Sequence, residues 1–534
     1  MGTLDEKTGD TIDVVAPADV NPQMSLPDTI VLRWPQLTTP QRESFDEKIS
    51  VDEVAKQLNA TPEEVLEVRE HSRSLSLQET REAAERLVSQ HNLDPNFPAG
   101  ALERLKAFLA NDDILTSPDS HAREISEAKV EVSLLTTNSP YAEVRAVVDP
   151  HDDPSLPVST IRAWVIGLAF VVFIAFINQL FSVRQPSITL RAEVVQLLAY
   201  PVGKAAERFL PDVGFTLFGV RHSLNPGPFS KKEHMLISIM ASVGRTLPSS
   251  RYIIFTQWMD RYFGQKYAKS FSYQILLALS TNLMGFGLAG LCRRFLVYPA
   301  FCLWPASLVT IALNSSLHNE TNHPVAGPFK KIYSISRYRF FLAAFACMFV
   351  WFWFPDYIFG ALSLFNTYFT AAVLFGSLGA RKVFGSGGIY TALLSAFPVG
   401  FAIPILFYVF QRRFPRTHWV AKIHPVMILS GGISWSPYNI AYMWPAVIPG
   451  WLSMVYLRQR YLAFWSKYNY VLSAALSTAI AIAAVVIFFA VSYHGFEVNW
   501  WGNHSEKGCE ATACTRLKLP KGEYFGPRVG TYAG

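Results

Sequence analysis

The chain has 534 residues, of which 50% are hydrophobic, 14% aromatic and only 16% charged. Soluble domains carry about 25% charged residues, so the composition excludes an ordinary soluble globular protein. The formal net charge of +6 averages an acidic first part and a membrane-like part with Lys and Arg in short loops. That balance indicates orientation in a bilayer and not nucleic-acid binding. Five cysteines are too few for a disulfide scaffold, and no neighbouring ligands complete a metal site.

The first 160 residues are predicted to be water-soluble. Three Ser/Thr-x-x-Glu patterns, which begin at Ser50, Thr61 and Ser76, predict capped helix starts within a small helical leader. Residues 113–157 are predicted to form a linker toward the membrane. The leader lacks the apolar core of a signal peptide, so we expect it to stay in the cytosol.

From residue 161 onward, apolar segments follow one another at the length of membrane helices, which predicts an all-α transmembrane bundle of roughly eight to ten crossings. Two consecutive segments are only half as long as a span and predict a broken or re-entrant helix. In chain order the segments are Ala163–Val183, Val194–Phe209, the half-length pieces Met235–Val243 and Tyr252–Met259, Phe271–Leu291, Leu296–Leu317, Phe340–Leu364, Thr367–Leu378, Ile389–Phe410, Pro425–Leu457 and Tyr470–Ser492.

A stretch between two of these segments, residues 225–234, combines broken backbone with ionisable groups. Its two prolines and its glycine forbid a regular helix. Broken backbone and ionisable side chains are both costly in lipid. The stretch is therefore expected to line an enclosed or water-filled path. Asn225 and the free carbonyls beside it could bind a peptide main chain, and Phe229 could pack against a ligand side chain. The alternative is a structural turn between helices.

Glu233 and His234 are the candidate proton-coupling residues, because a carboxylate removed from water and an imidazole can both bind and release a proton near neutral pH. The alternative is a wetted interfacial cluster that anchors a helix start together with Lys231 and Lys232. His318 is expected in a loop.

A second polar and aromatic set surrounds backbone breaks late in the chain. Trp435, Tyr438 and Asn439 could line a pocket for varied peptide side chains, because Tyr and Trp have apolar bodies with polar tips. The alternative is the aromatic belt at the membrane interface. No phosphate-binding loop, zinc-protease motif or nucleophile elbow occurs, so we expect neither an enzyme nor a cofactor, and no catalytic or metal-binding residue is predicted.

The stretch Asn225-Pro-Gly-Pro-Phe-Ser-Lys-Lys-Glu-His234 closely resembles the N-terminal signature of the oligopeptide transporter family. Further similar blocks are residues 293–299, 435–439 and 460–470, and the segment before the first span resembles fungal members. The resemblance extends in pieces from about residue 140 to the C-terminus. It implies secondary active transport of small peptides, including glutathione, by proton symport and alternating access.

The chain departs from the family pattern in its middle. Family members are longer, with about sixteen spans, and carry a second signature, Lys-Ile-Pro-Pro-Arg, which this sequence lacks. The resemblance passes from early spans to late spans between Asn366 and Ala380. We hypothesise that a central block is missing near residues 366–380.

The predicted organisation is a cytosolic leader over residues 1–160, a transmembrane transporter region over 161–494 and a polar tail over 495–534. The protein is expected to be multi-pass in the plasma membrane or an internal membrane, with small peptides and protons as partners. Two alternatives remain. One is a non-transporting or regulatory short form that binds itself or a full-length partner, and the other is a metal-chelate carrier, because relatives in this family move iron complexes.

Overall fold

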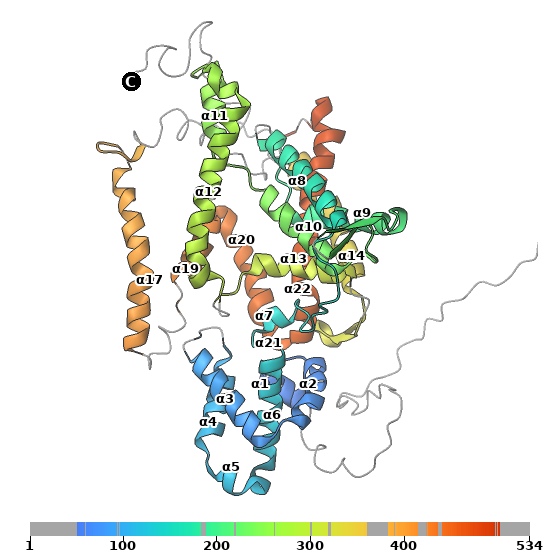
Figure 1. Ribbon diagram of the computed structural model, residues 1–534, viewed down its shortest axis with the longest axis vertical. Coiled ribbons are helices and arrows are strands. Elements are labelled where there is room, and N and C mark those ends of the chain that lie inside the picture. The colour runs from blue at the N-terminus through green and yellow to red at the C-terminus, as the bar shows by residue number, and fades with distance from the viewer. Residues whose placement is uncertain are drawn as a thin grey trace, which may run out of the picture. The chain divides into compact units, whose positions relative to one another are not determined.

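The computed structural model describes residues 51–501 except 59, 93, 95–96, 183–187, 218–219, 261, 299–301, 319–321, 360–382, 389, 415–422, 424, 436–439, 497 and 499. Within this part of the chain the fold is helical apart from two short β-hairpins, which confirms the predicted all-α class (Figure 1).

The leader is a set of short helices whose starts follow the predicted capping patterns. Thr61 and Ser76 each exchange hydrogen bonds with the glutamate three residues later, Glu64 and Glu79, in two complete capping boxes. The pattern at Ser50 lies outside the described residues. The helices are α1 (Val51–Leu58), α2 (Pro62–Ser74), α3 (Leu77–His91), α4 (Ala99–Ala110), α5 (Asp113–Thr116), α6 (Ala122–Thr137) and α7 (Ala142–Arg145).

Helix α6 occupies much of the segment that was predicted to be a linker. Ala128, Val132 and Leu135 recur at the spacing of one helix face and are buried against Ala84 and Leu105 of the leader core. The prediction of a linker was wrong because it rested on the charged residues of this segment and did not take account of its short apolar stripe. The leader core therefore includes a helix beyond those expected.

The segment after α6 connects the leader with helices of the membrane region. Arg145, nearly fully buried, pairs with Glu64 of α2, with 3.2 Å between Nε and Oε1. Glu143 on the same short helix pairs with Arg458, with 2.7 Å between Oε1 and Nη2. These two ion pairs connect α7 to α2 of the leader and to Arg458 of the membrane region.

Five helices in the described residues are long and apolar enough to cross a membrane, and the protein is an integral, multi-pass membrane protein. The predicted span Thr367–Leu378 lies outside the described residues. The helices that follow the leader are α8 (Ile161–Ser182), α9 (Ala192–Phe209), α10 (Lys231–Gly244), α11 (Ser250–Trp258), α12 (Phe271–Leu296), α13 (Pro305–His318), α14 (Arg337–Trp353), α17 (Ala396–Arg413), α19 (Pro425–Trp435), α20 (Ile440–Trp451), α21 (Arg458–Arg460) and α22 (Leu462–Ala490).

The half-length segments form two separate short helices, α10 and α11, as predicted. In contrast, the predicted span Leu296–Leu317 is wrong. Helix α12 ends at Leu296, and α13 begins only at Pro305 and has 14 residues. At ~1.5 Å per residue such a helix is ~21 Å long, short of the ~30 Å hydrocarbon core. Pro305 opens the new helix because a proline cannot continue one from the preceding turn.

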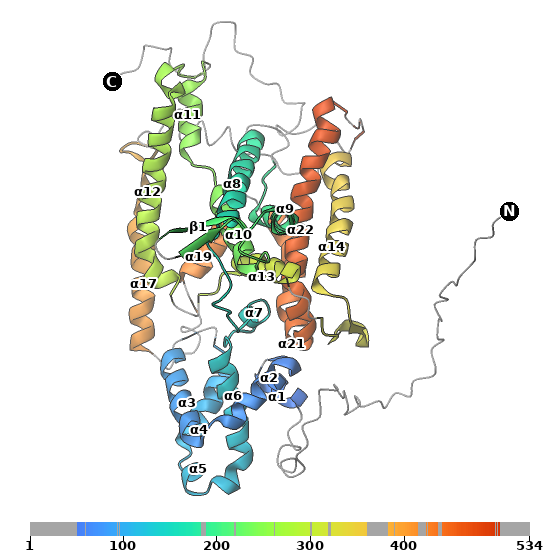
Figure 2. The same cartoon turned by 45° about the vertical axis from the view of Figure 1, so that its right-hand side comes forward.

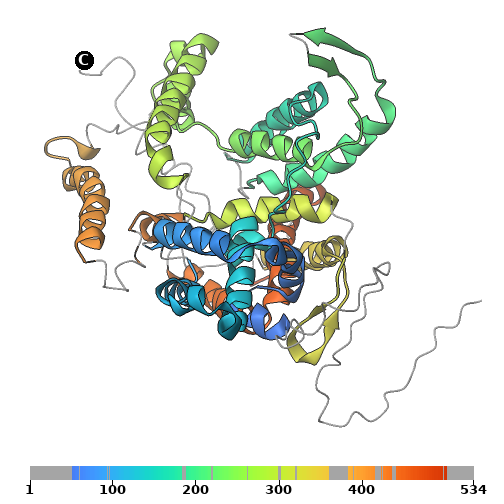
Figure 3. The same cartoon turned by 60° about the horizontal axis from the view of Figure 1, so that its bottom comes forward.

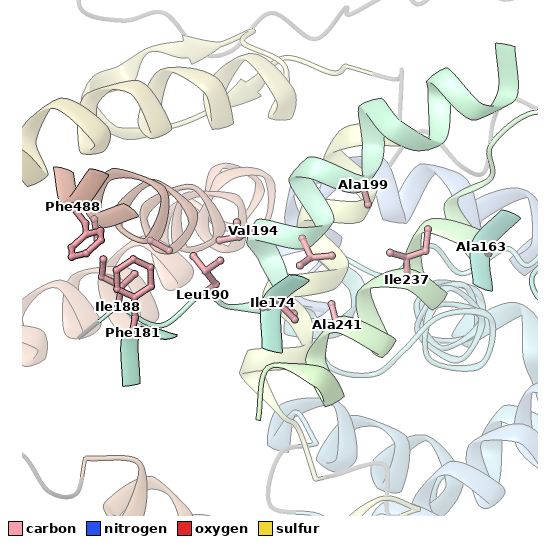
Figure 4. Packing of buried hydrophobic residues seen from close by; sticks show 14 of the residues in the cluster. Ala163, Ile174, Phe181, Ile188, Leu190, Val194, Ala199, Ile237, Ala241 and Phe488 are labelled. Atoms are coloured by element: carbon pink, nitrogen blue, oxygen red, sulfur yellow. The ribbon is translucent and has the colours of Figure 1, made fainter. Parts of the chain in front are cut away.

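Helices α8, α9, α10 and α22 share a buried apolar core (Figure 4). Phe181 and Phe488 meet edge to face within it, with 4.7 Å between ring centroids. The core also contains Ala163, Ala199 and Ala241, small residues that let membrane helices approach closely. Helix α14 packs along α22, as Figure 2 shows.

Two antiparallel hairpins were not predicted from the sequence. One joins β1 (Gly214–Leu217) to β2 (Val220–Ser223) between α9 and α10, and Figure 3 shows it beyond the end of α9. The other joins β3 (Val325–Ala326) to β4 (Ile332–Tyr333) between α13 and α14. Both are too short to alter the helical class.

Candidate functional site

The proline-rich stretch leads directly into α10 through a capping box. The hydroxyl of Ser230 accepts from the backbone N–H of Glu233 at 3.1 Å, and Oε2 of Glu233 accepts from the N–H of Ser230 at 3.1 Å. These bonds satisfy backbone N–H groups at the helix start that have no partner within the helix. The sequence Ser230-Lys-Lys-Glu233 carries the same Ser-x-x-Glu pattern that located two leader helices. This signal could have assigned Glu233 a capping role from the sequence alone.

Glu233 also forms an ion pair in which both side chains are fully buried. Arg162, at the start of α8, places Nη2 at 2.6 Å from Oε2 and Nε at 3.3 Å from Oε1. The hydroxyl of Thr160 donates to Oε1 as well. The pairing with Arg162 compensates the burial of two charges. In this conformation a proton on Glu233 would remove the counter-ion of Arg162.

Asn225 uses its side chain to hold the broken stretch together. Its Oδ1 accepts from Nη1 of Arg162 at 2.9 Å, and its Nδ2 donates to the carbonyls of Glu207 and Leu210, both at 2.8 Å. Gly227, at a φ of 132° that favours glycine, presents its carbonyl to the same Arg162 Nη1 at 3.0 Å. The amide of Asn225 is therefore occupied within the chain.

Phe229 lies in the core and not on an open surface. Its side chain is buried, and its ring occupies the space beside Gly203, where an added Cβ would lie 2.5 Å from the ring. Its backbone N–H donates to Oε2 of Glu207 at 2.8 Å. Glu207 in turn pairs with Lys204, with 3.0 Å between Nζ and Oε2. The stretch before α10 is therefore held against α9 by the packing of Phe229 and by its hydrogen bond to the carboxylate of Glu207.

His234, which is fully buried, connects α10 to two other helices. Its Nε2 lies 2.7 Å from the carbonyl oxygen of Gln196 on α9, and its Nδ1 lies 2.9 Å from Nε2 of His318 at the end of α13. His318, expected in a loop, is thus the last residue of a helix and a direct partner of His234.

Two amide oxygens next to this histidine pair are buried, and neither has a hydrogen-bond partner in the described part of the chain: Oε1 of Gln196 and Oδ1 of Asn314. The amide nitrogens are used, because Gln196 donates to the carbonyl of Thr310 at 3.0 Å and Asn314 to that of Lys231 at 2.9 Å. A buried acceptor without a donor is costly unless another state supplies one.

The two lysines of the stretch are bound by the acidic segment that precedes α8. Lys231 Nζ lies 2.8 Å from Oδ2 of Asp149, and Lys232 Nζ lies 2.8 Å from Oδ1 of Asp152. The hydrogen bond from Lys231 lowers the pKa of Asp149, which is outside the membrane-spanning segments. Ionised Asp149 therefore favours this contact.

Comparison with known proteins identifies the chain. The model of the OPT oligopeptide transporter protein family matches residues 158–387 and 365–491, which together exceed half of the chain. The chain belongs to the OPT oligopeptide transporter family. The resemblance drawn from the sequence is thereby confirmed.

Several curated relatives of this OPT family chain align over part of their length. Sexual differentiation process protein isp4 of Schizosaccharomyces pombe is 45% identical over 229 residues, which cover 43% of this chain and 28% of that protein. Oligopeptide transporter 2 of Saccharomyces cerevisiae is 31% identical over 366 residues, which cover 68% of this chain and 40% of that protein. Glutathione transporter 1 of Schizosaccharomyces pombe is 38% identical over 237 residues, covering 43% and 27%.

The chain therefore spans less than half the length of these relatives. No solved structure matches it. The relatives whose names state an activity are transporters, which agrees with the prediction that this OPT member is not an enzyme.

The structure brings together four of the residues singled out in the OPT signature, Asn225, Phe229, Glu233 and His234. Of the second set, Trp435 is the last residue of α19, its side chain is not among those described, and Tyr438 and Asn439 lie outside the described residues.

Sequence reasoning missed two partners of these four residues, Arg162 and His318. Arg162 could have been noticed as a charge at the start of a clean span, where a charge requires a partner. No local pattern pointed to His318, because its contact with His234 joins positions 84 residues apart.

Proposed function

We propose that this chain moves small oligopeptides, including glutathione, across a membrane together with protons. The observation that carries the proposal is the OPT family match across residues 158–491, since relatives in this family bear the names oligopeptide transporter and glutathione transporter. The discontinuous helices α10 and α11 support it, because secondary transporters form their sites where membrane helices are broken.

Proton coupling is proposed for His234, with Glu233 as its neighbour in the same helix turn. The contacts of Glu233 with Arg162, Thr160 and Ser230 support a structural role in the present conformation. Protonation of Glu233 would accompany a conformational change that separates it from Arg162. His234 can change its proton content without breaking that ion pair.

The proposed peptide contacts belong to another conformation of the same cycle. Asn225 and Phe229 are engaged inside the chain, so a peptide would reach them only when the turn moves. Trp435, Tyr438 and Asn439 complete the proposed set on the basis of their sequence pattern. Alternating access requires such a rearrangement around a fixed site.

A second candidate is a short form that binds a copy of itself or a full-length partner and transports nothing. Two features favour it. The chain spans less than half of its relatives' length, and the apolar windows of α12 and α17 are 0% buried within the described residues. The two segments matched by the family model overlap over residues 365–387, which supports a missing central block there. That junction lies largely outside the described residues.

Uptake assays in cells that lack peptide transporters separate these candidates. Cells expressing the chain should accumulate a labelled tetrapeptide and labelled glutathione faster at acidic than at neutral external pH. Unlabelled peptide should compete and an iron chelate should not. No uptake by the chain alone, together with uptake by a co-expressed full-length relative that changes when the chain is present, would favour the short-form candidate. Competition by the chelate alone would favour a chelate carrier. A chain at the cell surface without uptake in any arm would contradict the transport proposal.

A further inference from the structure

The pair formed by His234 and His318 has a defined arrangement of protons. The carbonyl oxygen of Gln196 can only accept, so Nε2 of His234 carries a hydrogen, and in the neutral ring Nδ1 must accept. The facing nitrogen, Nε2 of His318 at 2.9 Å, must then donate. In the neutral pair, Nδ1 of His318 is the nitrogen left to receive a proton.

We propose that His234 and His318 form a single proton site, which takes up one proton at Nδ1 of His318 and passes one along the hydrogen bond to His234. This inference rests on the proposed proton-coupled function. Uptake makes His318 an imidazolium with all bonds intact. Transfer of the Nε2 proton of His318 to Nδ1 of His234 then leaves His318 neutral and His234 charged. One proton enters, one moves, and none is lost.

The burial of the two rings gives this relay a direction. His318 is half-buried, whereas His234 is fully buried. Phe229 and Tyr200 cover both imidazoles, with ring-centroid distances of 5.1 to 5.9 Å. The proton therefore enters at the more accessible ring, His318, and the aromatic contacts are shared by both rings.

Several charges near the histidine pair are already matched in ion pairs, whereas Oε2 of Glu193 on α9 is buried without a hydrogen-bond partner in the described residues. Arg162 pairs with Glu233, Lys204 with Glu207, and Lys231 with Asp149. The other charged groups on α10 and on the helices packed against α10 or α13 are Lys232, which pairs with Asp152, Glu193 and Arg208 on α9, Arg337 and Arg339 on α14, and Lys467 on α22. Arg337 donates to the carbonyl of Ala146, and Lys467 donates to Asn322 and His323. A second proton would place two cations at 2.9 Å, so the pair should take up only one.

The protonated state changes the contact between α10 and the end of α13. Asn314, four residues before His318 on the same helix, has a buried Oδ1 that makes no hydrogen bond in the described structure. Once Nδ1 of His234 carries a hydrogen, that N–H donates and the deprotonated Nε2 of His318 accepts, so the bond between the rings is kept with its direction reversed. Proton uptake and transfer therefore reverse the direction of the hydrogen bond that joins α10 to the end of α13 and place the charge on its fully buried side.

The direct test is nuclear magnetic resonance of the wild-type chain in lipid nanodiscs, with nitrogen-15 and carbon-13 in its histidines. We expect a coupling across an N–H···N bond between two rings and one imidazolium formed per pair between about pH 4 and pH 8. His318→Gln, which keeps a hydrogen-bonding group but cannot titrate, should abolish the coupling. His323→Gln, an exposed neighbour, should not change it. Two independent titrations, or none in this range, would overturn the proposal.

Transport provides the second readout. His318→Gln should lose the acid-driven accumulation of labelled peptide, whereas the exposed His323→Gln should keep it. Equal acid-driven accumulation in the variant and the wild type would contradict the relay. If the wild type neither accumulates nor exchanges peptide, the proposed function fails, and the resonance experiment still decides whether the proton site exists.

Discussion

At the scale of single residues, the ion pair of Arg162 and Glu233 is the costliest contact to break in the described signature region. Both side chains are fully buried, and Glu233 accepts from Thr160 and Ser230 as well. Removing one member of such a pair leaves an uncompensated buried charge, which typically destabilises by about 3–5 kcal/mol. The pair therefore maintains this conformation whether or not Glu233 later binds a proton.

We predict that Arg162→Met or Glu233→Gln alone lowers the unfolding temperature of the purified protein strongly, and that the double variant recovers part of the loss. The recovery is expected because the double variant leaves no single buried charge. Thermal unfolding monitored by tryptophan fluorescence measures both. As a control, Arg221→Met removes the exposed ion pair with Asp212 and should cost no more than about 1 kcal/mol. Wild-type stability in both single variants would contradict a structural role for this pair.

Residue roles were predictable where the signal was local. The capping boxes at Thr61 and Ser76 follow from a three-residue spacing, and the same spacing at Ser230 was present but not used. The partner of Glu233 lies 71 residues earlier in the chain, and such a contact depends on how helices pack. Sequence patterns therefore identified the ionisable residues but not the pairs they form.

At the scale of elements, the acidic segment before α8 binds the start of α10 through Asp149 and Asp152. Because pairing with Lys231 lowers the pKa of Asp149, its folded value lies below the ordinary value of 3.8. The stabilisation is complete above the unfolded pKa and is lost only as pH falls through the lowered folded value. The external acidity used to test the proposed transport should therefore not release this contact.

Hydrogen exchange of the full chain in nanodiscs tests whether the acidic segment stays bound to the start of α10 at acidic pH. After correction for intrinsic rates, protection of residues 149–156 should be the same at neutral pH and at about pH 5. It should fall in the variant Asp149→Asn with Asp152→Asn, which keeps the local side-chain acceptors but removes the charges. Asp119→Asn, at an exposed position in the leader, serves as the control. Opening of this segment in the wild type already at about pH 5 would contradict the assignment.

Element boundaries were predictable where apolar length and breaks agreed. Helices α8, α10 and α11 follow their predicted segments closely. Apolar length alone misled at α13, where hydropathy extends across the gap between Leu296 and Pro305. At α6, composition predicted a linker where a helix forms, because the apolar stripe of this helix is narrow and lies among charged residues. The two hairpins carried no strand pattern strong enough to compete with helix.

At the scale of the whole molecule, the family follows from the sequence, whereas the completeness of the bundle does not. Helices α12 and α17 present apolar windows that are 0% buried in the described part of the chain. In longer relatives, additional helices could cover such faces. If the chain transports alone, the exposed faces of α12 and α17 must contact lipid or a second copy of the chain. If it requires a partner, helices of that partner would cover these faces.

The measurement that tests the central claim most directly is peptide uptake by purified protein in sealed vesicles under an imposed inward proton gradient. The account predicts that labelled tetrapeptide accumulates above the external concentration and that a protonophore abolishes the accumulation. Correctly inserted protein that moves no more peptide than protein-free vesicles, with the gradient intact, would contradict it.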